Sequence, residues 1–170
     1  MSLFVSSGAV FWGYLLAFVA ASLVCLGAAW RAWYIPYAGT RQSLLAFFLT
    51  SAAWAAAYIG FLLSASPLAK HFFYQISLLV GFGTVWAWLW FCSAYTGRAI
   101  HRNASAQWFA IIVYGGVILL KVTNPFHHLY YTLEPGQGEV FDLVIRHGLC
   151  YWIVMGVAYA LATAGYLMLF

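Results

Sequence analysis

Charged residues are scarce in this 170-residue chain, where they make up only 6% of the sequence. Soluble domains carry about 25%. Three of the charged residues are acidic, and all three fall in the segment 134–142: Glu134, Glu139 and Asp142. Hydrophobic residues make up 66% of the chain, which is more than a soluble fold can bury or carry on its surface. These proportions exclude an ordinary soluble domain and predict a membrane protein.

Carboxylates are absent from every long hydrophobic run of the sequence. Ionisable groups inside the membrane are the usual mark of proton pumps and ion-coupled transporters, so their absence weighs against both classes. Lys121 stands at the end of one run, where its ammonium can snorkel to the interface instead of forming a retinal Schiff base. We also recognise no set of nucleophile, base and orienting group, so we expect no catalytic activity in this chain.

Cysteines are few and far apart. Cys25, Cys92 and Cys150 each fall in a different hydrophobic run. Without the close spacing of a metal site or a disulfide framework, they are expected to act as small packing residues.

Long hydrophobic runs are what the sequence does contain. A helix needs roughly 20 apolar residues to cross the membrane, and five runs meet this length: 9–30, 43–63, 72–95, 104–122 and 148–170. The first run exceeds a signal-peptide core, so we expect it to be retained. The predicted fold is all-α, a polytopic bundle of five transmembrane helices that forms a single domain over residues 1–170.

The basic residues predict the orientation of this bundle. Four of the seven follow the first and third runs: Arg31, Arg41, Arg98 and Arg102. By the positive-inside rule these two segments are cytoplasmic in the inner cell membrane. The N-terminus and the loop 123–147 then face outward, and Phe170 lies at the cytoplasmic side. The net charge of +4 therefore reflects topology, and no nucleic-acid partner is expected.

The loop 123–147 is the one long connection between runs. Its residues 135–138 read Pro-Gly-Gln-Gly, a turn sequence, and the flanks 129–133 and 139–145 are rich in β-branched and aromatic residues. We predict a short outer β-hairpin between the fourth and fifth helices.

Five side chains on the second and third runs could line a ligand pocket. Thr50, Trp54 and Tyr58 recur at every fourth position and share one face of a helix. Tyr74 and Gln75 begin the third run, and a glutamine within the bilayer needs a protein partner or water. Two interpretations stay open: these residues pack the bundle, or they form an outward-opening pocket for a small hydrophobic ligand.

The sequence Asn124-Pro125-Phe126-His127-His128 follows the fourth run. The proline ends the helix, so we expect both histidines at the outer surface, with His147 near the same level. Imidazoles could bind zinc or copper together with Glu139 and Asp142, or titrate near neutral pH. No spacing here is diagnostic of a metal site, so we expect an outer-surface motif, without a metal or other cofactor.

Several stretches resemble, in order and spacing, the N-terminal seven-transmembrane sensor region of prokaryotic histidine kinases. They are TNPFHHLYYT (123–132), YQISLLVGFG (74–83), AYTGR (94–98), AAWAAAY (52–58) and YW followed by VAYAL (151–161). The resemblance implies a sensory input module, of which this chain covers about five of the seven helices. It also implies an outward N-terminus and cytoplasmic output, through a histidine kinase or another signalling domain of a two-component system.

This sequence departs from the family pattern at three places. Family members tend to carry a glutamate after the aromatic of the second helix, where this chain has Gly60 or nearby apolar residues. They tend to carry another before Tyr-Thr-Gly, where this chain has Ala94. A histidine of the fifth helix is replaced near Val154. These replacements imply a more apolar pocket than in the family, or a loss of sensing.

A different class of function also fits the composition. A non-catalytic accessory subunit of a larger membrane complex would show the same apolar exterior, nine tryptophans and lack of enzymatic groups. The expected partners are the lipid bilayer and a small hydrophobic ligand, together with a second copy of the chain or a larger membrane complex. Whether the natural protein continues beyond Phe170 is left open.

Overall fold

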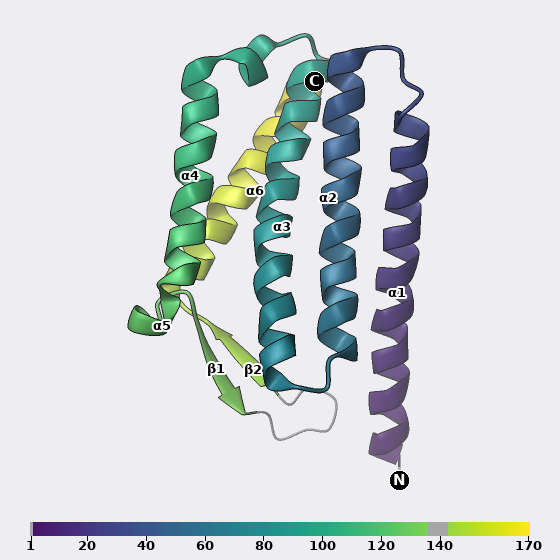
Figure 1. Ribbon diagram of the computed structural model, residues 1–170, viewed down its shortest axis with the longest axis vertical. Coiled ribbons are helices and arrows are strands. Elements are labelled where there is room, and N and C mark those ends of the chain that lie inside the picture. The colour runs from purple at the N-terminus through teal and green to yellow at the C-terminus, as the bar shows by residue number, and fades with distance from the viewer. Residues whose placement is uncertain (1, 136–142) are drawn as a thin grey trace.

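Five long helices dominate the computed structural model (Figure 1), which describes residues 2–135 and 143–170, with side chains for 8–98, 100, 102–133 and 145–170. They are α1 Ser2–Ala32, α2 Ala38–Leu63, α3 Pro67–Tyr95, α4 Ala104–Val122 and α6 Leu149–Leu169. Two short helices, the 3₁₀ helix η1 Ala99–Arg102 and α5 Asn124–His127, flank α4. In the described part of the chain, five helices are long and apolar enough to cross a membrane, which confirms the predicted fold class.

Helices α2 and α3 begin earlier than the hydrophobic runs predicted. Ser66 caps α3, because its Oγ accepts a hydrogen bond from the Ala69 N–H at 3.1 Å, and Pro67 occupies the first turn. Caps of this kind satisfy N–H groups that a helix start leaves unpaired. The helix therefore includes Lys70 and His71, which a count of apolar residues leaves out.

The helices run alternately up and down, with α3 at the centre. In Figure 1, α1, α2 and α3 stand in a row, and α6 crosses behind α3 at an angle. Helix α4 stands on the side of α3 that is away from α1 and α2. Helix α3 packs against both α2 and α6. We call the end that holds η1 the η1 end, and the opposite end, near the N-terminus, the hairpin end.

A two-stranded antiparallel sheet lies between α5 and α6, as predicted. Strand β1 is Tyr131–Pro135 and β2 is Leu143–His147, with Tyr131 opposite His147 and Leu133 opposite Ile145. The strands begin later than the sequence suggested. Residues 128–130 instead end α5 and accept backbone hydrogen bonds from the start of α6. The predicted turn residues 136–138 lie outside the described part.

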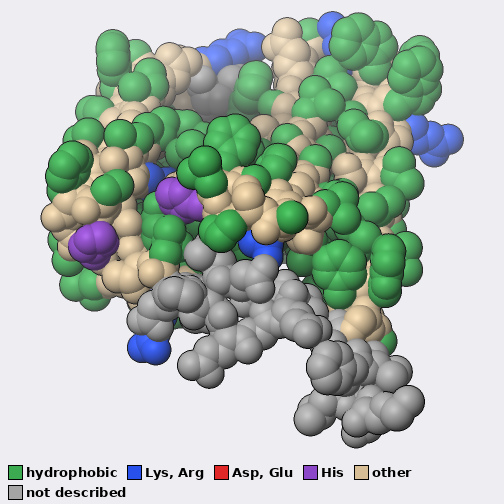
Figure 2. Space-filling model, turned by 60° about the horizontal axis from the view of Figure 1, so that its bottom comes forward, with side chains coloured by type: hydrophobic (Ala, Val, Ile, Leu, Met, Phe, Trp, Pro, Cys, Tyr) green, Lys and Arg blue, Asp and Glu red, His purple; other side chains and the backbone are tan. Residues whose placement is uncertain are grey.

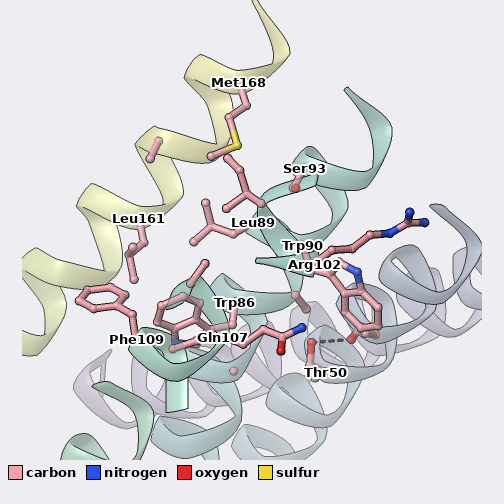
Figure 3. Close-up of a pocket in the computed structure, with 17 residues that line it drawn as sticks. Thr50, Trp86, Leu89, Trp90, Ser93, Arg102, Gln107, Phe109, Leu161 and Met168 are labelled. Atoms are coloured by element: carbon pink, nitrogen blue, oxygen red, sulfur yellow. Dashed lines mark hydrogen bonds between the residues drawn. The ribbon is translucent and has the colours of Figure 1, made fainter. Parts of the chain in front are cut away.

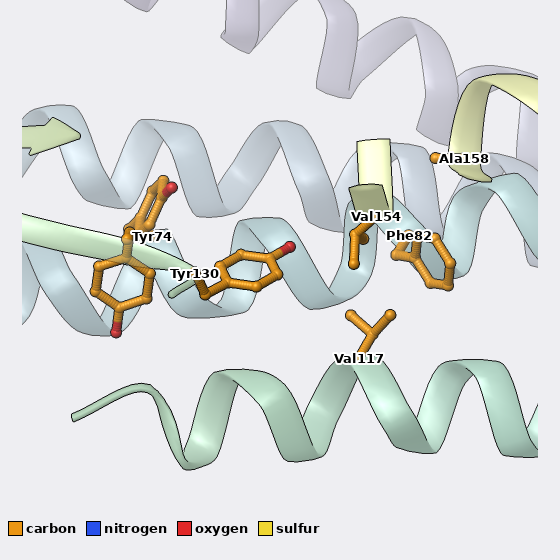
Figure 4. Close-up of a cluster of buried hydrophobic side chains, with 7 residues drawn as sticks. Tyr74, Phe82, Val117, Tyr130, Val154 and Ala158 are labelled. Atoms are coloured by element: carbon orange, nitrogen blue, oxygen red, sulfur yellow. The ribbon is translucent and has the colours of Figure 1, made fainter. Parts of the chain in front are cut away.

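A cluster of buried side chains joins the hairpin to the helices (Figure 4). Tyr74 and Phe82 of α3 pack with Val117 of α4, Val154 of α6 and Tyr130, which precedes β1. Elsewhere, large hydrophobic side chains are exposed on the helices, and the hairpin end is also largely hydrophobic on the face that Figure 2 shows. Such an exterior is stable against lipid and unstable against water.

Candidate functional site

The first turns of α3 present polar side chains to the hairpin. His71 and Gln75 are one turn apart and lie on the same face of the helix. Tyr74 stands beside them and is buried, with 6% of its surface exposed. The early start of α3 at Pro67 is what places all three in regular helix.

Tyr131 of β1 lies at the centre of a hydrogen-bond network with these residues. Its hydroxyl oxygen is 2.6 Å from Nε2 of His71, and it accepts a hydrogen bond from the Gln75 amide. Gln75 Nε2 is also 3.0 Å from Nε2 of His71. Strand β2 adds a second link, since Nε2 of His147 is 3.1 Å from the Tyr74 hydroxyl. We call these five residues, from α3, β1 and β2, the hairpin network.

Asn124 fixes the backbone that leads into β1. Its Oδ1 accepts hydrogen bonds from the N–H groups of Tyr130 and Tyr131, at 2.9 and 3.2 Å, and its Nδ2 donates to the Tyr131 carbonyl at 2.9 Å. The side chain is buried, so water cannot take over these bonds. Asn124 therefore holds Tyr131 in place for its contacts with α3.

The strand-side groups of the site are neutral near pH 7. Burial raises the pKa of Tyr130 to about 12. Burial also raises the pKa of Tyr131, against a smaller opposing effect of hydrogen bonds from Asn124 and Gln75. The pKa of His147 is lowered because burial disfavours its charged form. These groups therefore offer hydrogen bonds and no charge.

Lys121, in the last turn of α4, has a buried ammonium group. Only 4% of the residue is exposed, and Nζ lies 5.6 Å from the centre of the Tyr130 ring. This distance is typical of a cation–π contact. Among the described residues, Nζ has no hydrogen-bond partner. The expectation that Lys121 snorkels to the interface is wrong, because the chain after α4 folds back and covers it.

The adjacent histidines have local structural contacts. Nδ1 of His127 accepts a hydrogen bond from the Leu129 N–H at 3.0 Å, and its Nε2 is 3.1 Å from Oγ1 of Thr123. His128 is exposed and ends α5 in the left-handed conformation, with φ of 52°. No group of three potential metal ligands occurs in the described part of the chain. Glu139 and Asp142, which completed the metal alternative, lie outside it.

The five pocket candidates fall at three different places. Tyr58 stacks on Phe18 of α1 at 4.9 Å, and Trp54 meets both rings edge-on, so these two side chains join α1 to α2. Tyr74 and Gln75 belong to the hairpin network. Thr50 lines a separate cavity nearer the η1 end. Ligand binding by any of these residues stays a prediction.

Sequence reasoning missed His71, Tyr131 and the structural role of Asn124. The Ser66-Pro67 pair was a usable signal, because a capping residue followed by proline predicts a helix start there and brings His71 onto the face of Gln75. Their contact with Tyr131 joins positions 60 and 56 residues apart in sequence, which no local pattern indicates.

These features define a polytopic helical membrane protein in which a small hairpin is hydrogen-bonded to the central helix at one end. The family model described as the N-terminal 7TM region of histidine kinase matches residues 3–170, so the chain belongs to that family, as the motifs predicted. The match takes up nearly the whole of this chain. No curated protein and no solved structure matches the chain.

Proposed function

We propose that this chain is the sensory input module of a signalling protein and responds to a small ligand that comes from outside or is dissolved in the membrane. The bound state is read by a cytoplasmic output domain. Membership in the sensor-region family supports the general role. The observation that carries the proposal is the hairpin network, because it places exchangeable hydrogen bonds between a surface hairpin and the central helix.

The network is mechanically connected to α6. The Gly148 N–H donates to the Tyr130 carbonyl at 2.9 Å, and the Cys150 N–H donates to the Leu129 carbonyl at 3.0 Å. Helix α6 then runs to the η1 end, where Trp88 of α3 donates to the Ala162 carbonyl at 3.2 Å. A displacement of β1 therefore displaces the start of α6 relative to α3.

A ligand transmits a signal only if it binds two conformations of the bundle with different affinity. A hydrogen-bonding ligand that competes for Tyr131 or Gln75 meets this condition, because it favours the state in which β1 has left α3. The replacement of family carboxylates by Gly60 and Ala94 fits an uncharged ligand. We propose Trp54 and Tyr58 as apolar walls that this ligand reaches from the hairpin side.

The test is phosphate incorporation by the natural gene product in membrane vesicles. Tyr131→Phe and Gln75→Leu each remove part of the network, and we expect either to change the phosphorylation level by about fivefold or more. That factor corresponds to about 1 kcal/mol in the conformational equilibrium. Tyr95→Phe, at an exposed position at the other end of α3, is the control. Wild-type levels in both network variants would refute the proposal.

The orientation is part of the proposal. The η1 end carries Arg31, Arg41, Arg98 and Arg102, and the three acidic residues belong to the hairpin segment, so the hairpin end should face outward. In a variant without the native cysteines, an impermeant thiol reagent should label Gly136→Cys in intact cells and leave Asn103→Cys unlabelled. Labelling of position 103 alone would reverse the orientation.

A further inference from the structure

A cavity of about 820 Å³ opens between α2, α3, α4 and α6 near the η1 end. Its volume is in the range of small-molecule sites. Trp86 and Leu89 of α3, Phe109 of α4, and Leu161 and Met168 of α6 line it (Figure 3). Such a lining favours a hydrocarbon occupant over water.

Two long polar side chains lie at the rim of the cavity. Arg102 and Gln107, from η1 and the start of α4, are exposed at its rim, while Thr50 and Gly83 lie deeper among the helices. Along α3, the lining extends from Gly83 to Ser93, a distance of about 15 Å at 1.5 Å per residue. The site is therefore an elongated apolar space with a cationic group at its solvent-exposed rim.

Among the described residues, those at the η1 end near Arg102 include no acidic residue. All three carboxylates belong to the segment 134–142, whereas the η1 end carries four arginines and no acidic residue. The hairpin lies at the opposite end of the bundle (Figure 1). An anion that pairs with Arg102 must therefore come from another molecule, and the apolar cavity beside it requires that molecule to carry a hydrocarbon chain.

We propose that this cavity binds an anionic membrane lipid, with an acyl chain between α3, α4 and α6 and the head group on Arg102. Charge complementarity distinguishes a lipid from a further apolar helix, which would leave the guanidinium without a counter-ion. A basic residue close to an anionic lipid surface contributes about 1 kcal/mol, which corresponds to about a fivefold change in affinity. The site lies apart from the hairpin network, and the proposal does not rest on the signalling role.

The experiment is native mass spectrometry of the whole protein, delipidated in a neutral detergent. The two probes are phosphatidylglycerol and phosphatidylcholine with the same acyl chains, so that they differ in head-group charge. We expect one phosphatidylglycerol to bind at least about fivefold more tightly than phosphatidylcholine. Free inorganic phosphate should not displace it, because phosphate cannot fill the apolar space.

Two pairs of variants separate the head-group contact from the cavity. Arg102→Gln should remove the preference for phosphatidylglycerol, whereas Arg31→Gln removes the same charge at the end of α1, away from the cavity, and should preserve it. Ala164→Phe fills the cavity and should weaken binding of both lipids. Ala160→Phe is its control, since Ala160 is exposed one turn earlier on α6 and does not line the cavity.

Equal binding of the two lipids, or an unchanged preference in Arg102→Gln, would overturn the proposal. So would wild-type lipid binding by Ala164→Phe. A protein that binds no lipid and instead forms a dimer that Ala164→Phe disrupts would show that a second copy fills the cavity. Folding of each variant is checked by its helical circular dichroism and by comparison with its paired control.

Discussion

Asn124 satisfies three backbone groups with one amide side chain. It accepts from two N–H groups and donates to one carbonyl at the entry to β1, in a position that water does not reach. Replacing this amide leaves buried backbone groups unpaired, each at a cost of about 1–3 kcal/mol. At the residue scale, the position of Tyr131 therefore depends on a side chain outside the strand that carries it.

Asn124→Ala should lower the free energy of unfolding by about 2–3 kcal/mol, because the N–H groups of Tyr130 and Tyr131 lose their acceptor. Unfolding in mixed detergent, followed by tryptophan fluorescence, measures this change. Asn103→Ala is the comparison, since exposed Asn103 only caps α4 through the Ser105 N–H, and its loss should cost about 1 kcal/mol or less. Equal effects of the two variants would contradict the role of Asn124.

His147 should make stability depend on pH. Burial lowers its pKa in the folded protein below the ordinary value of 6.5, so the unfolded chain takes up a proton first as the pH falls. Its contribution is fully present above pH 6.5 and is lost as the pH falls through the lower, folded-state pKa. Unfolding midpoints should therefore fall less between pH 7.5 and pH 5 in His147→Asn than in the wild type. An identical pH dependence would show that His147 is not involved.

At the element scale, the junction between β2 and α6 leaves no room for a side chain. A Cβ atom built on Gly148 would lie 2.2 Å from the Leu129 carbonyl oxygen, a backbone atom that cannot rotate away. The backbone of Gly148 has an ordinary negative φ, so the constraint is close approach and not left-handed geometry. The start of α6 and the segment before β1 thus behave as one packed unit.

Gly148→Ala should separate these two segments and cost about 1–3 kcal/mol, as expected for overpacking. Thermal unfolding of the purified protein measures this loss. Gly115→Ala is the matched control, because a Cβ atom there meets nothing within 4 Å and alanine favours a helix more than glycine does. A neutral effect of Gly148→Ala would mean that the junction can relax without loss.

The sequence was informative about elements and less so about contacts. Five apolar runs predicted five helices because backbone hydrogen bonds must be satisfied within each membrane segment. Helix starts were missed where polar residues such as His71 extend α3 beyond its apolar run. The burial of Lys121 was missed because it depends on how the chain folds back after Pro125, which is a tertiary property.

At the scale of the whole molecule, different chemistry is concentrated at the two ends of the bundle. The hairpin end holds uncharged hydrogen-bonding groups and the acidic segment. The η1 end holds four arginines and an apolar cavity that one of them, Arg102, lines. Helices α3 and α6 pack on each other and connect the two ends. The central claim is that loss of the hairpin network moves α6 relative to α3 at the η1 end.

Spin-label distances test this claim most directly. Tyr95→Cys on α3 and Leu167→Cys on α6 are exposed labelling positions at the η1 end, used in a variant without the native cysteines and in lipid nanodiscs. Combining Tyr131→Phe with Gln75→Leu should shift the distance distribution by about 1–2 Å or add a second population, as expected for a helix shift. Tyr34→Phe, at an exposed position beyond α1, should leave it unchanged. Superimposable distributions for the wild type and the network variant would contradict the account.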